Sequence, residues 1–308
     1  MKLVVTIFAI VLGLFAINSA SAESIRVTLL GTGTPAPSVD RYGPSTLVEA
    51  GNEKLLFDVG RGATVRLAQA KIPLKGITVF LTHLHSDHIN GLGDLWASGY
   101  MGPVFREKPL KIFGPTGIAQ LTDGLKIAFQ PDVDIRSVEM AARNQPFYVS
   151  GANFDPTEVK GDGVIFDKGG VTVTAIRVKH AENTAFGYRV DYDGKTVVVS
   201  GDTSFSENLM KKSEGADLIV HEVMGASDML MKNPLIKGVL EVHTTPAQAG
   251  TLFSKVQPKL AVYTHLLLFG VSEEDLVTQT RKTYSGPLKV GQDLMTFVVD
   301  DEVSIMNR

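Results

Sequence analysis

The sequence predicts a layered α/β fold in a single domain. Segments with the periodicity of strands and of helices alternate loosely in both halves of the chain. Some strand-like segments, such as residues 197–199, are continuously apolar, which is typical of sheets that are covered on both faces. No internal repeat, charge block or low-complexity linker divides the 308 residues. We therefore expect one compact domain over residues 23–308, preceded by a short leader.

Residues 1–22 are predicted to be a cleavable signal peptide. Lys2 precedes an apolar run over residues 3–17, and Ala20 and Ala22 supply small side chains at the −3 and −1 positions of a cleavage site. The run is too short for a membrane-spanning helix, which needs about 20 residues. We expect cleavage after Ala22, no stable membrane anchor, and a periplasmic or secreted mature chain. An uncleaved anchor is the alternative.

Local patterns place the elements of the domain along the chain. Gly51 and Asn52 form a turn signal between two strand-like segments, which predicts a hairpin. Ser272 is a predicted helix N-cap, with Glu273 and Glu274 in the first turn of that helix. The polar stretch over residues 130–162 is interrupted by Pro and Gly, and we expect a loop or lid there. The expected strands cover residues 25–30, 45–50, 54–57, 77–81, 110–113, 171–178, 185–190, 196–199 and 260–264, and the expected helices cover residues 63–70, 245–256 and 272–284.

The composition excludes several classes of protein. A hydrophobic content of 44% and a charged content of 20% are those of a globular chain, which argues against disorder. The net charge of −3 argues against a protein whose main role is to coat nucleic acid. The chain has no cysteine, which excludes disulfides, thiolate metal sites and cysteine nucleophiles. Any metal ion must therefore be held by His, Asp and Glu.

A cluster of histidines follows the strand-like segment that ends at residue 81. His83 and His85 point the same way on extended backbone, and a turn at Ser86 returns Asp87 and His88 to the same volume. Imidazole and carboxylate groups without thiolate suit zinc, iron or manganese. A group of surface histidines is the alternative. Three further candidates follow strand-like segments in the same way, namely His180, Asp202 and His265.

The motif His83-Leu84-His85-Ser86-Asp87-His88 resembles the HxHxDH motif of the metallo-β-lactamase superfamily, and His180, Asp202 and His265 follow in the expected order. This resemblance implies an αββα sandwich with the metals at one edge of the two sheets. It implies two divalent ions, of which Zn²⁺ is expected and Mn or Fe is the alternative. By this resemblance the first ion would be held by His83, His85 and His180, the second by Asp87, His88 and His265, and Asp202 would bridge them.

Further motifs resemble the ribonuclease Z and arylsulfatase-like branch of that superfamily. They include Leu30-Gly31-Thr32-Gly33-Thr34-Pro35, Phe57-Asp58-Val59-Gly60, Gly201-Asp202-Thr203, His221-Glu222 and His243-Thr244-Thr245. The resemblance implies that Glu222 and His243 form a dyad that donates a proton to the leaving group. A buried ion pair with no chemical role is the alternative.

Two departures from ribonuclease Z direct the functional expectation. Bacterial ribonuclease Z enzymes carry a long arm that grips tRNA, whereas residues 190–201 suffice only for a hairpin here. Those enzymes also place a Ser and an Arg after the last metal ligand, whereas residues 266–269 are Leu-Leu-Leu-Phe. We therefore expect an exported hydrolase of small anionic sulfate or phosphate esters, arylsulfatase-like or phosphodiesterase-like, with nucleic acid an unlikely partner. Water activated between the two ions would be the nucleophile, and Asp87 would accept its proton.

Other functions stay open as alternatives. They are ribonuclease Z-like 3′ processing of tRNA, hydrolysis of β-lactams or lactones, and metal binding without catalysis. Asp58 is a candidate for orienting a ligand histidine, and an ordinary turn residue is the alternative. Trp96 either lines the pocket or packs in the core. A group of apolar residues lines either the pocket mouth or a homodimer contact, namely Met229, Leu230, Met231, Leu235 and Ile236.

Overall fold

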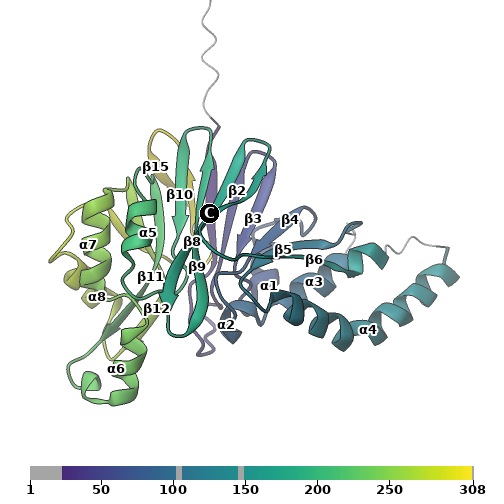
Figure 1. Ribbon diagram of the computed structural model, residues 1–308, viewed down its shortest axis with the longest axis horizontal. Helices are drawn as coiled ribbons and strands as arrows, with labels where there is room; N and C mark the ends of the chain where they lie inside the picture. The colour runs from purple at the N-terminus through teal and green to yellow at the C-terminus, as the bar shows by residue number, and fades with distance from the viewer. Residues whose placement is uncertain (1–22, 102–105, 145–148, 307–308) are drawn as a thin grey trace, which may run out of the picture.

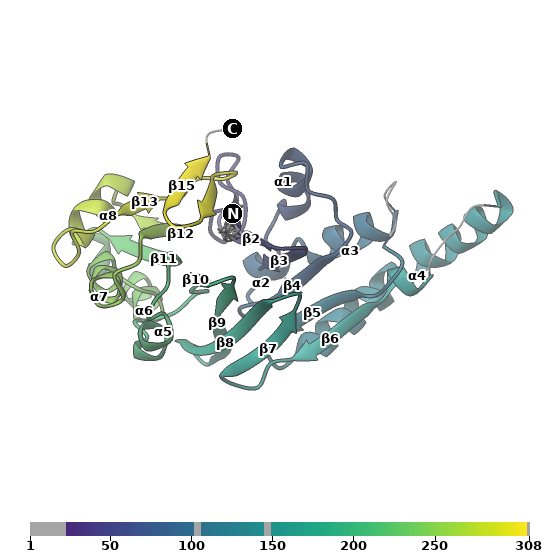
Figure 2. The same cartoon turned by 90° about the horizontal axis from the view of Figure 1, so that it is seen from above.

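The computed structural model describes residues 23–101, 106–144 and 149–306. The predicted signal peptide over residues 1–22 lies outside the described residues, so it stays a prediction. In the described part of the chain, no helix is both long enough and apolar enough to span a bilayer. The described chain folds into two β-sheets that pack face to face, with helices on the outer faces (Figures 1 and 2).

The first sheet has eight strands in the order β15-β14-β1-β2-β3-β4-β5-β6. Its N-terminal part is antiparallel, and β3, β4, β5 and β6 are parallel to one another. The strands are β1 (Ile25–Gly31), β2 (Ser45–Ala50), β3 (Glu53–Phe57), β4 (Ile77–Phe80), β5 (Leu110–Gly114), β6 (Phe154–Glu158), β14 (Thr296–Val299) and β15 (Val303–Met306).

The second sheet has seven strands in the order β13-β12-β11-β10-β9-β8-β7. Strands β10 to β13 are parallel, and β7, β8, β9 and β10 are antiparallel neighbours. The strands are β7 (Gly163–Lys168), β8 (Val171–His180), β9 (Asn183–Tyr192), β10 (Lys195–Val199), β11 (Leu218–Ala226), β12 (Leu260–Phe269) and β13 (Leu288–Val290).

Three hydrophobic clusters hold these layers together. One fills the space between the sheets, the second lies under the helices on the first sheet, and the third lies under the helices on the second sheet. This is the αββα sandwich that was expected. The helices are α1 (Ala63–Gln69), α2 (Ser86–Ile89), α3 (Leu92–Met101), α4 (Ile118–Ala142), α5 (Glu207–Lys212), α6 (Pro234–Glu241), α7 (Pro246–Val256) and α8 (Glu273–Thr280), with short 3₁₀ turns η1 (Val149–Ala152) and η2 (Leu230–Lys232).

Local signals placed several element boundaries correctly. The β2–β3 hairpin turns at Gly51, whose φ of 53° is readily adopted by glycine. Ser272 caps α8 in a capping box with Asp275, and Thr245 caps α7 in a capping box with Gln248.

The expectation of a loop or lid over residues 130–162 was wrong for most of that stretch. Helix α4 continues through Pro131 to Ala142, and residues 154–158 form strand β6. The outer half of α4 is polar because it extends away from the body of the protein, as Figures 1 and 2 show, and only Val133 in that half is buried. A helix without a core-facing stripe lacks the periodic signal by which helices are found in a sequence.

Trp96 packs in the hydrophobic core and does not line a pocket. Its side chain is fully buried and stacks on Phe154, with 4.8 Å between ring centroids. Tyr100 and Phe129 meet the indole ring edge-on. The core alternative was therefore the correct one for this residue.

Candidate metal centre

The first part of the centre is the turn between β4 and α2. His83 follows the strand and is fully buried, whereas His85 is exposed and has the extended backbone of a helix N-cap. The backbone N–H of His88 donates to the carbonyl of His85, with 3.1 Å between N and O. Because the chain turns into a helix at Ser86, Asp87 and His88 face the same volume as the two preceding histidines.

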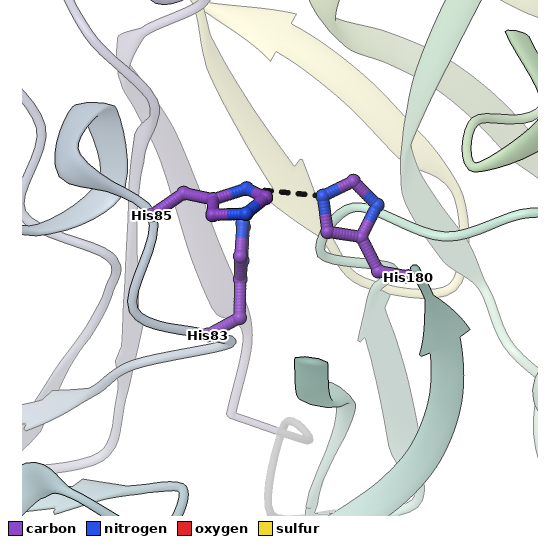
Figure 3. A group of neighbouring side chains, drawn as sticks. All are labelled: His83, His85 and His180. Carbon is purple, nitrogen blue, oxygen red and sulfur yellow. Dashed lines mark hydrogen bonds between the residues drawn. The ribbon is translucent and has the colours of Figure 1, made fainter. Parts of the chain in front are cut away.

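His83, His85 and His180 form one group of converging side chains (Figure 3). His180 comes from the end of β8, across from the β4–α2 turn, and its Nε2 lies 3.1 Å from Nδ1 of His85. The Nδ1–H of His180 donates to the carbonyl oxygen of Val242 at 2.9 Å, which directs Nε2 toward His85 and the centre. The three ligand atoms lie within 4.8 Å of one another.

Asp87, His88 and His265 form a second group. The Oδ2 atom of Asp87 lies 3.2 Å from Nε2 of His265 and 3.5 Å from Nε2 of His88. His265 lies inside β12, at a β-bulge where Glu222 pairs with Thr264 and Val223 pairs with Leu266. The extra residue has a φ of 46°, and the bulge turns its imidazole toward the other ligands.

Asp202 lies between the two groups. Its Oδ2 is 3.3 Å from Nε2 of His88, 3.6 Å from Nε2 of His265, 3.8 Å from Nε2 of His180 and 3.9 Å from Nε2 of His83. The turn at Gly201, with a φ of 60°, carries it there from the end of β10. A carboxylate that is close to ligands of both groups is placed to bridge two cations.

The chemistry of these side chains fits metal ions. Within the two ligand groups and Asp202, four buried side-chain atoms have no hydrogen-bond partner among the described residues, namely Nε2 of His83, Nε2 of His88, Oδ1 of Asp202 and Nδ1 of His265. Burial and the neighbouring His88 hold the pKa of His83 well below its usual range, so His83 is a neutral donor. Burial opposes ionisation of Asp202, but the surrounding histidines hold its pKa well below the usual value. The donor set indicates a binuclear metal site.

Asp58 orients one of these histidines. Its Oδ2 accepts a hydrogen bond from Nδ1 of His88 at 2.7 Å, so Nε2 of His88 faces the centre. The carboxylate also accepts from the backbone N–H and the hydroxyl of Thr82, each at 2.8 Å. Burial lowers the pKa of His88, but Asp202 and Asp58 outweigh it and raise this pKa well above the usual value.

Glu222 and His243 lie beside the centre as a buried ion pair. Oε2 of Glu222 is 3.3 Å from Nδ1 of His243, while Oε1 accepts from the backbone N–H groups of Thr203 and Thr244. The His243 ring is 4.9 Å from that of His180 and 5.9 Å from that of His265, measured between centroids. Burial opposes protonation of His243, but Glu222 raises its pKa to about 9. Nε2 of His243 can therefore present a proton to the centre at neutral pH.

The structure thus brings together every residue that was predicted for the site, although their roles as ligands stay predictions. Sequence reasoning missed the carbonyl of Val242, because a backbone contact leaves no side-chain signal. His221, next to Glu222, is buried outside the centre, and its Nδ1 donates to the carbonyl of Glu222 at 2.6 Å.

Comparison with known proteins identifies the family. Residues 54–266 match the model of the beta-lactamase superfamily domain. The ribonuclease Z of Mycobacterium marinum is 33% identical over 279 residues, which cover 88% of this chain and 97% of that protein. The chain belongs to the metallo-β-lactamase superfamily, in its ribonuclease Z branch.

Solved structures agree on the fold. The metallo-beta-lactamase fold protein YhfI from Bacillus subtilis superposes with a TM-score of 0.70 at 20% identity, covering 90% of this chain and all of that one. The short form of human tRNase Z superposes with a TM-score of 0.63 at 24% identity, covering 88% of this chain and 98% of that one. This ribonuclease Z-branch protein is a metal-dependent hydrolase.

The expectation of a hydrolase of small sulfate or phosphate esters was wrong, and so was the expectation that nucleic acid is an unlikely partner, whereas export stays a prediction. Relatives that share a third of their residues over nearly the whole chain are ribonuclease Z enzymes. The apolar residues 266–269 were one of the two departures on which this expectation rested. In the structure they are the last residues of strand β12, where Leu266 and Leu267 are buried against β11 and Leu268 is 38% exposed.

Proposed function

We propose that this protein is an endoribonuclease that hydrolyses a phosphodiester bond at the 3′ end of tRNA precursors. The observation that carries the proposal is the position of Asp202, between two ligand groups and within reach of the Glu222–His243 pair. A phosphodiester needs both features, because charge builds on its phosphoryl oxygens while an alkoxide leaves. The ribonuclease Z relatives support the choice of RNA as the substrate.

Two different residues of the chain would accept and donate the protons of the reaction. When bound, two divalent ions lower the pKa of water and neutralise charge on the phosphoryl oxygens. Asp87, whose carboxylate has a lowered pKa because His265 and His88 outweigh its burial, accepts the proton of the attacking water. His243 donates a proton from Nε2 to the leaving oxygen, while Glu222 holds Nδ1 and stabilises the imidazolium.

Zinc is the ion that we propose for both positions. Neutral imidazole and carboxylate ligands at four-coordinate sites suit Zn²⁺, whose catalytic sites keep one position for water or substrate. Manganese and iron share this preference for nitrogen and oxygen donors. Metal analysis of the protein purified without chelators would identify the ion.

The experiment is cleavage of a transcribed tRNA precursor that carries a 3′ trailer. Zinc-loaded protein should cut it once, at the junction of the acceptor stem and the trailer, and Asp202→Ala should abolish the cut. Bis(p-nitrophenyl) phosphate serves as a substrate that reports the metal centre alone. If this small diester is hydrolysed while the precursor stays intact, the RNA proposal is wrong.

The β9–β10 hairpin offers little surface for binding RNA. Residues 190–201 form the β9–β10 hairpin, which turns at Asp193 and Gly194 and carries no arm. Its single cation, Lys195, is buried and lies near Asp300. Other surfaces around the centre must therefore contact the RNA.

A further inference from the structure

A cleft of about 400 Å³ opens between the loop over residues 34–42 and the start of α1. We call it the Arg61 cleft, after the cation among its lining residues Pro37, Val39, Tyr42, Arg61 and Val65. Its volume is in the range of pockets that bind small molecules. Val39 is 86% exposed and Val65 is 47% exposed, so the apolar wall is open to a ligand.

The backbone that carries Arg61 packs against the ligand-bearing turn. The N–H of Val59 donates to the carbonyl of His88 at 2.8 Å, and a Cβ on Gly60 would lie 2.7 Å from the carbonyl oxygen of Asp87. Arg61 follows Asp58 by three positions in the chain, so their Cα atoms are at most about 11 Å apart. The cleft is therefore close enough to receive the part of an RNA strand next to the scissile phosphate.

Arg61 differs from the two neighbouring arginines in having no carboxylate partner. Arg41 is paired with Glu273, and Arg66 is paired with Asp293 at 2.9 Å. Among the described residues, Arg61 makes no ion pair, and its Nη2 lies 3.5 Å from the carbonyl oxygen of Thr34 and 3.4 Å from that of Ala36. Such long contacts leave most of the five guanidinium donors available, and the planar fork matches two phosphate oxygens.

The walls around this cation are apolar and held in place. The guanidinium carbon of Arg66 lies over the ring of Tyr42, 4.0 Å from the ring centroid. The backbone N–H of Tyr42 donates to Oδ2 of Asp293 at 2.8 Å. Pro37, Val39 and Val65 add aliphatic surface on which the face of a nucleobase can lie. The guanidinium of Arg61 can therefore bind a phosphate while the apolar side chains beside it contact the base of the same strand.

The neighbours of the cleft indicate which half of the cleaved strand it would contact. His243, the proton donor, contacts the rings of His180 and His265, whereas the Arg61 segment contacts Asp87 and His88. The leaving oxygen would therefore be at His243, and the part of the substrate that keeps the phosphate would extend past Asp87 and His88 toward the Arg61 segment. On the basis of the proposed RNA cleavage, we propose that the Arg61 cleft binds the nucleotide that keeps the phosphate after cleavage. Its base lies against Val39 and Val65, and the next phosphate along the strand binds Arg61.

Three p-nitrophenyl phosphodiesters separate the parts of this subsite. Bis(p-nitrophenyl) phosphate has no nucleoside, the p-nitrophenyl ester of uridine 5′-phosphate adds one, and the ester of the 5′-phosphorylated dinucleotide UpU adds a second phosphate. The leaving group is the same in all three. The wild-type KM should fall along the series, because each addition fills one more part of the cleft.

Arg61→Gln should raise KM for the dinucleotide ester about tenfold, since a charge-assisted contact contributes about 1.5 kcal/mol. The slope of log KM against log salt should fall by about 0.7, the value for one phosphate of a single strand. Arg61→Lys should recover part of the loss. Val65→Asp should raise KM for both nucleoside-containing esters. Arg26→Gln, a matched change of an exposed arginine on β1, should leave all three substrates unaffected.

A binding measurement gives a second readout that does not depend on turnover. Fluorescence anisotropy of labelled tetrauridylate should show weaker binding to metal-free Arg61→Gln than to metal-free wild type. Equal KM ratios and equal affinities in Arg61→Gln and Arg26→Gln would overturn the proposal, as would a wild-type KM that does not change along the series. A Val65→Asp variant that alters only self-association would assign the wall to a protein contact instead. Failure of the RNA function itself has a different signature, an uncut tRNA precursor.

Discussion

Oε2 of Glu222 and Nδ1 of His243 are 3.3 Å apart in a buried ion pair. Burial would lower the pKa of His243, but the carboxylate raises it to about 9, so the imidazole is protonated at neutral pH. Activity that needs this proton should fall as the pH rises above that value. In Glu222→Gln the raising charge is lost and burial dominates, so the alkaline fall should move to lower pH. Profiles of kcat/KM against pH would measure the shift.

The same variant should discriminate between leaving groups. General acid catalysis contributes about 10² to 10⁴-fold, and an alkoxide depends on it more than a nitrophenolate does. Glu222→Gln and His243→Ala should therefore slow RNA cleavage far more than hydrolysis of bis(p-nitrophenyl) phosphate. Glu139→Gln, on the exposed face of α4, is the matched control. Equal losses on both substrates would remove the pair from the acid role.

The position of Asp202 between both ligand groups predicts the metal stoichiometry. Wild-type protein should bind two transition-metal ions per chain, and Asp202→Ala should lose most of the second equivalent because the four neighbouring imidazoles lose their shared carboxylate. Dialysis followed by elemental analysis measures both values. Asp155→Ala, on an exposed part of β6, should retain two ions. One ion in saturated wild type would contradict the binuclear site.

The parts of the site that could be predicted from the sequence are those coded by neighbouring residues. His83, His85, Asp87 and His88 are within one turn, so their spacing alone brings them together. His265 was found only as a residue after a strand, because a β-bulge depends on the pairing between β11 and β12. The hydrogen bond from His180 to the carbonyl of Val242 depends on where the segment after α6 crosses β8, which no local pattern encodes.

The elements of the fold were likewise predicted where neighbouring residues encode them and missed where tertiary contacts decide. Strands with apolar runs, such as residues 77–80, and helices with capping boxes, such as α7, could be predicted because local propensity and burial agree there. Helix α4 was missed because its outer half makes few core contacts and contains Pro131. The significance of residues 266–269 was misjudged because Leu266 and Leu267 are buried in strand β12, and a sequence alone does not distinguish a buried apolar strand from an exposed apolar surface.

Trp96 should contribute to stability and not to catalysis. Trp96→Ala would open a cavity among Phe154, Tyr100 and Phe129 and should cost about 3–5 kcal/mol of unfolding free energy. Trp96→Phe should cost less, since the buried Nε1 has no hydrogen-bond partner among the described residues. Urea unfolding followed by circular dichroism measures this, because no other tryptophan is present as a fluorescent probe. A large change in KM with unchanged stability would place the indole in the site after all.

The leader also gives a definite expectation. The small residues Ala20 and Ala22 predict that a bacterial host expressing the full chain will produce a mature protein that begins at Glu23. Ala20→Arg and Ala22→Arg should block this processing, since the cleavage site requires small side chains. N-terminal sequencing of the fractionated cells checks it, and an intact Met1 in unmodified protein would show that the segment is not a cleaved leader.

Asp58 should control metal affinity through His88 without touching an ion. Its φ of 59° is in the left-handed region, which Asn adopts readily, so Asp58→Asn keeps the backbone and removes only the charge. The amide cannot hold Nδ1–H of His88 and the two donors of Thr82 as the carboxylate does at 2.7 and 2.8 Å. We expect a loss of about 10 to 100-fold in metal affinity, the usual effect of removing such a partner. Competition with a chelator measures it, and Asp123→Asn on exposed α4 is the control. If Asp58→Asn binds metal as tightly as wild type, the carboxylate only shapes the turn, and the orientation of His88 must come from the packing around its ring.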